Sequence, residues 1–542
     1  MTRRANATAA GAPPRALGLL ASAIVFAAGC AVFLPTLRYP FLNWDDNVYV
    51  VQNPWIRSLS WENVKLVFTQ PYFQNYLPLH LFSYMLDHAV WGLRALGYHL
   101  SSVLLHGLNA VLCLAVVRRM SRSLLVAFLA ALLFAVHPSH VEAVAWVSSR
   151  KEVLSTTFLL LSLLFYLMAR RGETLRTGPY AASVAAFLLA MLSKVSVVVL
   201  PAFLLALDAM PAGTGSRPRS RPSLVRAMLE KIPYGIVGAA LLFVNSRVQV
   251  TARAAYAHEP LRYLSVKGHA VWNYMALLFG SGNSPDYDLP RLDANPLGVP
   301  LALLGWVLLP AAAFMLYRAK RRLEFLGVVW VFVTLLPALL FPLVTYMAER
   351  YLYAPSAGIC WAIAAAVVGL TARPGALARG AGAAVAVALL ALFTVRTLQY
   401  SRVWSSSEAL WTFALTKSRD YRVYNNLAQV RLEQKRWDEA ERLLRRGALV
   451  ENVVSHQSLG VMYYTLGRLP EALVETDRAI EIQTRKRPDP SVVAELRFNR
   501  GAVLWSLGRA GEAAGEWRAA LEANPRHAQA REWLGVAERS AR

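Results

Sequence analysis

Charge is scarce in this sequence, cysteine is scarcer, and two common catalytic loops are missing. Only 17% of the 542 residues are Asp, Glu, Lys or Arg, and 56% are hydrophobic, which excludes an ordinary water-soluble domain of this length. The three cysteines, Cys30, Cys113 and Cys360, each lie in an apolar run, so we expect neither a disulfide framework nor a cysteine metal site. The absence of a Gly-rich nucleotide loop and of a Gly-x-Ser-x-Gly motif argues against a nucleotide-driven pump and a serine hydrolase.

The apolar residues are gathered into long runs. Segments such as 124–136, 153–167 and 381–393 contain no charged residue, and about 20 mostly apolar residues are enough for a helix to cross a bilayer. The first run lacks the small-residue cleavage site of a signal peptide, so we interpret it as a retained anchor. We predict eleven spans, near 16–36, 98–118, 123–141, 153–169, 179–193, 195–211, 228–247, 298–317, 325–344, 352–371 and 379–396.

Basic loops alternate with longer or aromatic-rich loops along these predicted spans. The net charge of +24 could indicate a nucleic-acid partner, but much of the excess lies in short loops, where it sets the orientation of the spans. All the basic segments fall on one side of the eleven-span arrangement, and the positive-inside rule makes that side cytoplasmic. We therefore predict no nucleic-acid binding, a cytoplasmic N-terminus and an external C-terminal part. The basic segments are 3–15, 118–122, 170–176, 217–231, 318–322 and 373–379.

The composition changes after Arg396, where small residues begin to recur at fixed offsets. The spacing is that of the 34-residue tetratricopeptide repeat, in which small residues lie where paired helices cross. Three units begin near Tyr421, Val453 and Ala494, and residues 527–540 are typical of a capping helix. We predict an all-α chain with a transmembrane helical domain over 1–400 and a tetratricopeptide-repeat α-solenoid over 401–542.

Acidic and histidine side chains gather after two of the predicted spans. Asp45 and Asp46 follow the first span, and neighbouring carboxylates compete for ionisation, so one can act as a base or share a cation; a solvated, capped turn is an equal alternative. His137, His140 and Glu142 end the third span. They are weak evidence for zinc, and ordinary capping of a helix end explains them better.

Two further outer segments carry basic and aromatic side chains. Lys194 joins two spans with almost no loop, where it either snorkels to the interface or binds an anionic lipid head group. The planar guanidinium of Arg350 is suited to binding a phosphate, unless an ion pair with Glu349 neutralises its charge. Tyr351 and Tyr353 are also typical of the aromatic belt at a membrane interface. With the acids, this set suits transfer from a lipid-phosphate-linked donor to an external acceptor, with an Asp base and a Lys or Arg stabilising the leaving phosphate.

Three segments, NWDD at 43–46, HPSHVEAV at 137–144 and ERYLY at 349–353, precede the trailing repeats. This combination resembles the transmembrane and tetratricopeptide-repeat family of O-mannosyltransferase-like enzymes with a GT-C fold. The resemblance implies inverting transfer of a sugar, such as mannose, from a polyprenyl-phosphate donor to a protein hydroxyl on the outer face of the membrane. It also implies a catalytic acid in the first outer loop, which is Asp45 or Asp46 here, and we favour Asp45 as the base.

The same resemblance implies roles for the remaining residues. Glu142 and His140 would shape the cavity or assist through a second acidic site, with His137 beside them in the substrate-binding set. Lys194 and Arg350 would contact the lipid phosphate. The substrate-binding set is completed by Glu349, Tyr351 and Tyr353. The repeats would bind the acceptor polypeptide, since their concave surfaces suit extended peptides.

Several points stay open from the sequence. A divalent cation, Mg²⁺ or Mn²⁺, is a candidate cofactor, although no cage of ligands is evident. The alanine- and arginine-rich composition favours a bacterial inner-membrane protein with an undecaprenyl-linked donor and periplasmic repeats. The alternatives to this function are a non-catalytic membrane scaffold for envelope assembly and an oligosaccharide ligase or polymerase that uses a diphosphate-linked glycan.

Overall fold

The structure is a computed structural model that describes residues 15–73, 75–210, 222–248, 259–341, 345–485 and 489–540. The chain divides into two compact units, Met1–Ser406 and Ser407–Arg542. We call the first the membrane unit and the second the repeat unit. Both are built from helices, and a single two-stranded sheet is found among the described residues. The predicted all-α fold class, with membrane helices followed by repeats, is confirmed.

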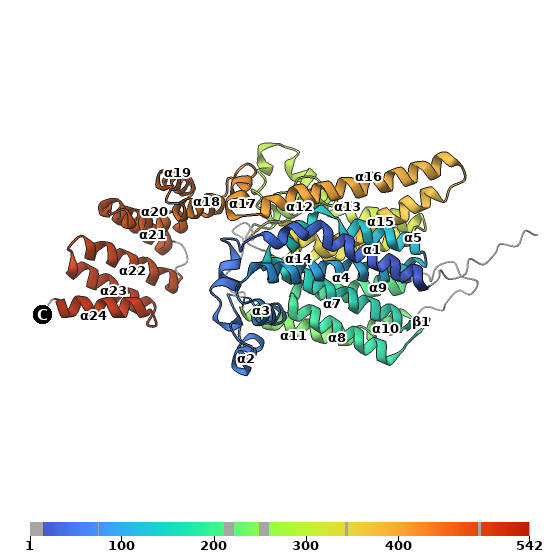
Figure 1. Cartoon of the computed structure of the whole chain (residues 1–542), viewed down its shortest axis with the longest axis horizontal. Helices are drawn as coiled ribbons and strands as arrows, with labels where there is room; N and C mark the ends of the chain where they lie inside the picture. The colour runs from blue at the N-terminus through green and yellow to red at the C-terminus, as the bar shows by residue number, and fades with distance from the viewer. Residues whose placement is uncertain are drawn as a thin grey trace, which may run out of the picture. The chain divides into compact units, whose positions relative to one another are not determined.

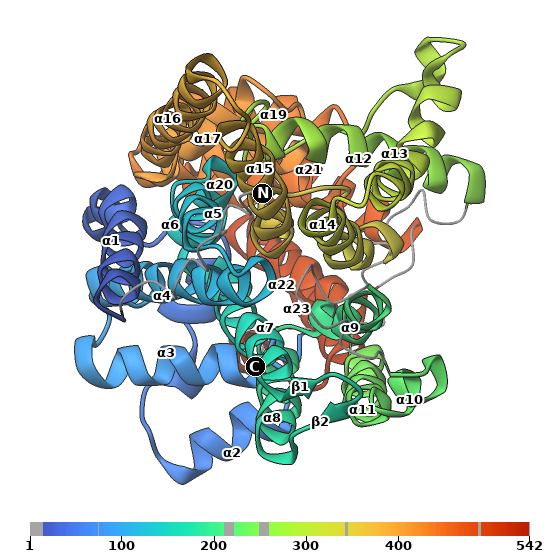
Figure 2. The same ribbon diagram turned by 90° about the vertical axis from the view of Figure 1, so that its right-hand side faces the viewer.

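Long helices run side by side through the membrane unit (Figures 1 and 2). Helix α4 packs against both α5 and α7, and side chains such as Val116, Leu133 and Leu160 on these helices are fully buried. The helices are α1 (Arg15–Phe33), α2 (Trp61–Thr69), α3 (Pro78–Trp91), α4 (Ala95–Ser121), α5 (Leu124–Ala135), α6 (Val141–Ala145), α7 (Arg150–Ala169), α8 (Thr177–Ser193), α9 (Leu200–Ala209), α10 (Leu224–Leu229), α11 (Ile232–Val248), α12 (Pro260–Leu278), α13 (Gly298–Arg318), α14 (Arg322–Leu340), α15 (Tyr353–Thr371) and α16 (Ala376–Ser401).

Each of the eleven predicted spans coincides with an apolar helical segment, but the segments are not all long enough to cross a bilayer alone. Within the described part of the chain, eight helices are long and apolar enough, and the bent pair α5 and α6 makes a ninth if it counts as one span. The other two predicted spans are the shorter apolar helices Thr177–Ser193 and Val195–Ala209. The orientation predicted from the loop charges stays a prediction.

Two breaks in these apolar segments have local causes. The helices α5 and α6 meet at a bend of 50°. At the bend, His137 has extended backbone and Pro138 follows it. The helix ends here because proline lacks the N–H that would continue its hydrogen bonding and disfavours helical backbone in the residue before it. Lys194 also has extended backbone between α8 and the 3-10 turn Val195–Val199. Both breaks turn polar side chains into the interior of the membrane unit.

The segments 37–97 and 248–297, which we predicted as loops outside the membrane, contain helices. Helices α2 and α3 lie in the first, and Tyr84 of α3 donates a hydrogen bond to the carbonyl of Val147 at 2.6 Å. Helix α12 lies in the second, where buried Lys267 donates to the carbonyls of Ala338 and Tyr346 at 3.0 and 3.1 Å. Residues 249–258 of that predicted loop lie outside the described residues.

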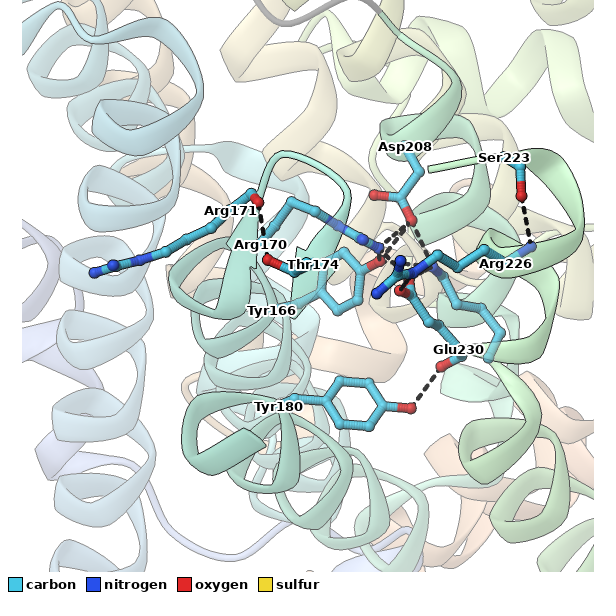
Figure 3. A network of polar contacts seen from close by, with 10 residues as sticks. Tyr166, Arg170, Arg171, Thr174, Tyr180, Asp208, Ser223, Arg226 and Glu230 are labelled. Carbon is cyan, nitrogen blue, oxygen red and sulfur yellow. Dashed lines mark hydrogen bonds and ion pairs between the residues drawn. The ribbon is translucent and has the colours of Figure 1, made fainter. Parts of the chain in front are cut away.

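A network of ion pairs joins α7, α9, α10 and α11 beside a short hairpin, in which β1 (Arg170–Arg171) pairs antiparallel with β2 (Thr174–Leu175). Figure 3 shows one Asp208 oxygen accepting from Tyr166 at 2.5 Å and from Arg170 at 2.7 Å. The same oxygen accepts from Lys231 at 2.5 Å, and Arg170 also pairs with Glu230 at 2.5 Å. The network and hairpin lie at the opposite end of the bundle from α2 and α3 (Figure 1).

The repeat unit begins with α17 (Ser407–Leu415) and then stacks paired helices. Buried small residues lie where the paired helices cross, as predicted: a Cβ on Gly460 would meet Thr476, and one on Gly501 would meet Trp517. The pairs are α18 (Tyr421–Glu433) with α19 (Trp437–Ala448), α20 (Val453–Thr465) with α21 (Leu469–Arg485), and α22 (Pro490–Ser506) with α23 (Ala510–Ala523), followed by α24 (Ala528–Ser540). These three pairs and α24 occupy the segments in which we predicted three repeats and a cap, and residues 486–488 of the second predicted unit lie outside the described residues.

Candidate functional site

A cavity of about 730 Å³ opens among α7, α11, α14 and the segment that leads into α15. Its polar lining comes from the start of α7, from the Lys194 break and from the 3-10 turn Glu349–Leu352. Its apolar lining comes from helices α11 and α14 and from the turn after Lys194. The charged lining residues are Lys151, Glu152, Lys194 and Arg350, and the apolar ones include Leu159, Val195, Leu242, Pro337 and Phe341.

Arg350 is fixed from behind by a buried carboxylate. Glu142 on α6 is fully buried; one of its oxygens pairs with the Arg350 guanidinium and the other accepts the Arg350 backbone N–H at 2.8 Å. The guanidinium carbon also lies 5.4 Å from the centre of the Trp146 ring and 5.0 Å from that of Tyr351. The ion pair with Glu142 and the two ring faces hold the planar group in one orientation, and the second Glu142 oxygen fixes the Arg350 backbone.

Lys194 is held by a second carboxylate at the same end of the cavity. Its ammonium forms an ion pair with Glu152, which is nearly fully buried on α7. The ammonium lies 4.8 Å from the centre of the Tyr351 ring. Lys194 and Arg350 therefore both contact Tyr351, and three side chains predicted for substrate binding from two segments meet at one place.

The two neighbouring aspartates have different surroundings. Asp46 is fully buried: one oxygen accepts from the backbone N–H and the hydroxyl of Ser148 at 2.9 and 2.5 Å, and the other accepts from the N–H of Leu42 at 3.0 Å. Burial raises its pKa to about 6, although these hydrogen bonds oppose the shift. Asp45 is half-buried and interacts electrostatically with Lys151 at the cavity.

A stack of tryptophans connects the Asp45 loop to Arg350. Trp44, which precedes Asp45, is stacked on Trp146 with ring centres 4.2 Å apart and planes inclined by 16°. The Arg350 guanidinium lies over the same Trp146 ring. Because Trp146 is almost completely buried, its ring is a fixed surface that sets the place of the loop with Asp45 relative to Arg350.

The predicted histidines point into the protein interior. His137 hydrogen-bonds the carbonyl of Leu278 at 3.0 Å, His140 hydrogen-bonds the hydroxyl of Ser356 at 2.6 Å, and both rings are fully buried. Among the described residues, no group of three His, Cys, Asp or Glu side chains could hold a metal ion. These histidines tie the α5–α6 bend to α12 and α15.

Glu349 and Tyr353 also lie away from the cavity lining. Glu349 is fully buried and accepts hydrogen bonds from Asn283 at 2.8 Å, from the N–H of Ser284 at 2.6 Å and from Tyr287 at 2.7 Å. The ion pair of Arg350 is thus formed with Glu142, which is distant in sequence. The Tyr353 hydroxyl hydrogen-bonds His106 and Asn109 at 2.8 and 3.1 Å.

The structure therefore brings Lys194, Arg350 and Tyr351 together at the cavity, with Glu142 directly behind them. Our prediction of site residues missed Lys151 and Glu152, which both line the cavity. Two adjacent charges that open a long apolar helix are a usable signal, because charge at membrane depth is costly and usually has a functional or structural partner.

Comparisons with known proteins match both units. The family model described as tetratricopeptide repeat matches residues 494–542. The chain is 33% identical to protein O-mannosyl-transferase TMTC2 of Mus musculus over 29% of this chain and 20% of that protein. It is 24% identical to protein O-mannosyl-transferase TMTC3 of Mus musculus over 80% of this chain and 51% of that protein. The chain thus spans about half the length of TMTC3.

Among solved structures, the crystal structure of ArnT from Cupriavidus metallidurans bound to undecaprenyl phosphate covers 93% of this chain and 80% of its own. The sequence identity is 14% and the TM-score is 0.35, which is too low to support a functional assignment. The relatives and the apolar helices make this chain an integral membrane protein. With its trailing repeats, the chain is similar to the protein O-mannosyl-transferases of the transmembrane and tetratricopeptide-repeat family over 78–80% of its own length.

Proposed function

We propose that this chain is a membrane glycosyltransferase that moves a sugar, such as mannose, from a polyprenyl-phosphate donor to a protein hydroxyl. The observation that supports this proposal most is the cavity whose charged end holds Lys151, Lys194 and Arg350 and whose remaining wall is largely apolar. Cationic groups suit a phosphate, and an apolar wall inside a membrane unit suits a polyprenyl chain. The names of the relatives support the same class of reaction.

The reaction breaks one bond at the sugar and forms another. The acceptor oxygen attacks the anomeric carbon, the bond from that carbon to the phosphate oxygen breaks, and the acceptor proton passes to a base. Attack from the face opposite the phosphate inverts the anomeric centre. The phosphate changes from a singly charged diester to a monoester that can carry a second negative charge, so cations placed at the phosphate stabilise the transition state more than the substrate.

Asp45 is the stronger candidate for the base. Both oxygens of Asp46 already accept hydrogen bonds inside the protein, and a base needs a free oxygen within hydrogen-bond reach of the acceptor. Asp45 is half-buried and interacts with the cavity residue Lys151. In this proposal Asp46 fixes the loop, and the repeat unit binds the acceptor polypeptide, in line with the concave surfaces of such arrays.

The proposal is tested with the purified full-length chain in lipid nanodiscs, given radiolabelled polyprenyl-phosphate mannose and a Ser/Thr-containing peptide. We expect transfer by the wild type and a loss of about 100-fold or more in Asp45→Asn, since a general base contributes about 10²–10⁴-fold. Glu62→Gln, which removes an exposed carboxylate on α2, is the matched control and should keep full activity.

Parallel assays with EDTA, Mg²⁺ or Mn²⁺ test the candidate cofactor, and a diphosphate-linked oligosaccharide donor tests the ligase alternative. Transfer from the diphosphate-linked donor alone would replace the proposed function with that alternative. Equal transfer by the wild type and Asp45→Asn would refute the role of Asp45.

A further inference from the structure

The three cations that line the cavity differ in whether a carboxylate already neutralises them. Arg350 is paired with Glu142 and Lys194 with Glu152. Lys151 forms no ion pair with a carboxylate in the described parts of the chain, and its ammonium faces the Tyr49 ring instead. An ion pair cancels most of the field that a distant anion would feel, so the attraction of this cavity for an incoming anion comes mainly from Lys151.

The ammonium group of Lys151 is held at the cavity beside an aromatic ring. It belongs to the first turn of α7 and lines the cavity, and its ammonium lies 5.3 Å from the centre of the Tyr49 ring. The Tyr49 hydroxyl accepts a hydrogen bond from Asn75, another lining residue, at 3.0 Å. A ring face attracts an ammonium without using up its donors, so those donors stay available to a ligand.

Lys151 is also coupled to the other charged groups of the proposed reaction. It interacts electrostatically with the proposed base Asp45, which favours its positive charge, and with Arg350 and Lys194, which oppose it. Its place in the cavity lining makes it available to a phosphate there. The flexible stem and the compact charge of a lysine suit a phosphate whose charge rises during the reaction.

We propose that the Lys151 ammonium is the direct ligand of a lipid-linked phosphate, whereas Arg350 and Lys194 act from their ion pairs as positioning groups. The inference rests on the proposed function for the identity of the lipid. In the transfer, Lys151 accepts no proton and forms no bond to the sugar; it stabilises the second negative charge that appears when the phosphate leaves.

The test measures binding without catalysis. The full chain in phosphatidylcholine nanodiscs is titrated with radiolabelled polyprenyl phosphate, which carries no sugar. We expect Lys151→Gln to weaken binding by about 10- to 100-fold, as for the loss of one charge-assisted contact. Lys151→Arg should keep most of the affinity, and Lys65→Gln, which removes an exposed lysine on α2, should bind as the wild type does.

Two further measurements complete the test. The first shows whether a loss of binding comes from the lost phosphate contact or from misfolding, and the second shows which lipid supplies the phosphate. Lys151→Met, which keeps an unbranched apolar side chain, must lose phosphate binding while retaining binding of polyprenol and the wild-type melting temperature. Phosphatidic acid is the competitor, and its failure to displace the ligand would identify the polyprenyl lipid as the preferred source. Displacement at equal concentration would widen the ligand to lipid phosphates in general and leave the role of Lys151 intact.

The two proposals fail in different ways. Wild-type affinity in both Lys151→Gln and Lys151→Met would overturn the inference even if sugar transfer is observed. Lys151-dependent phosphate binding without any sugar transfer would uphold the inference and refute the proposed function. A wild type that does not bind polyprenyl phosphate would overturn the inference directly.

Discussion

The buried carboxyl of Asp46 makes the stability of the membrane unit depend on pH in an unusual direction. Most carboxylates in proteins are stabilised in their ionised form, so stability falls when the pH is lowered. Asp46 has the opposite shift, from 3.8 to about 6, because full burial outweighs its hydrogen bonds. The folded state therefore binds the proton more tightly than the unfolded state does.

The size of the effect follows from the two pKa values. The stabilisation is fully present below the unfolded value of 3.8 and is lost as the pH rises through about 6. Each unit of pKa difference corresponds to about 1.4 kcal/mol, so the contribution of Asp46 to the free energy of unfolding falls by about 3 kcal/mol across this window. Above it, the contribution no longer changes with pH.

Asp46→Asn isolates this contribution because asparagine does not titrate. The variant loses the acceptor for the Leu42 N–H, which costs about 1–3 kcal/mol at every pH. The measurement is the free energy of unfolding in mild detergent, by urea titration between pH 4 and pH 7.5, for the wild type, for Asp46→Asn and for the exposed control Glu62→Gln. The wild type should lose its advantage over Asp46→Asn as the pH rises.

The free energy of unfolding of the control Glu62→Gln should follow that of the wild type at each pH. Only a small difference is expected, because an exposed glutamate has nearly the same pKa in the folded and unfolded states. A constant difference between the wild type and Asp46→Asn would refute the raised pKa. A difference that grows with pH would show that the three donors around Asp46 stabilise the carboxylate more than burial destabilises it.

Two further predictions concern the ion pairs at either end of the bundle. Glu142→Gln leaves the largely buried Arg350 guanidinium without a charged partner and should lower the free energy of unfolding by about 3–5 kcal/mol. Combination with Arg350→Met should recover most of this loss, and no recovery would contradict the pairing. Asp208→Asn removes the anion shared by Arg170 and Lys231 and should lower the melting temperature. Polyprenyl-phosphate binding should stay within about twofold of the wild type, because none of the partners of Asp208 lines the cavity. A parallel loss of binding would show that the network also sets the shape of the cavity.

The spans and the repeats could be predicted from the sequence because both are local patterns. An apolar run of sufficient length, or a small residue at a fixed offset, can be recognised without knowing what it contacts. Helix α12 was missed because it mixes apolar residues with polar ones such as Lys267 and His269. Its buried ammonium is satisfied by backbone carbonyls from another segment, and no local pattern indicates such a partner.

The surroundings of individual site residues could not be predicted for a related reason. Neighbours in a helical turn point in directions roughly 100–120° apart, so adjacent polar residues enter different environments. Asp46 turns into the interior while Asp45 stays half-buried, and Glu349 pairs with the 283–287 segment while Arg350 pairs with Glu142. Of the three motif segments, only 349–353 contributes residues to the cavity lining, namely Arg350 and Tyr351, and no local pattern indicated which of its side chains would face the cavity.

The arrangement of charge in the cavity explains how a membrane protein can keep three cations together before a ligand arrives. Unpaired cations at this spacing would repel one another and each would lose its hydration, a cost of several kcal/mol per ion. Two buried carboxylates, Glu142 and Glu152, offset two of the cations. Lys151 is left without an ion-pair partner among the described residues, so its ammonium can meet the single negative charge of the proposed phosphodiester donor. A cavity with all three cations unpaired would bind the doubly charged product more tightly than the donor and would slow its release, so the paired arrangement favours turnover.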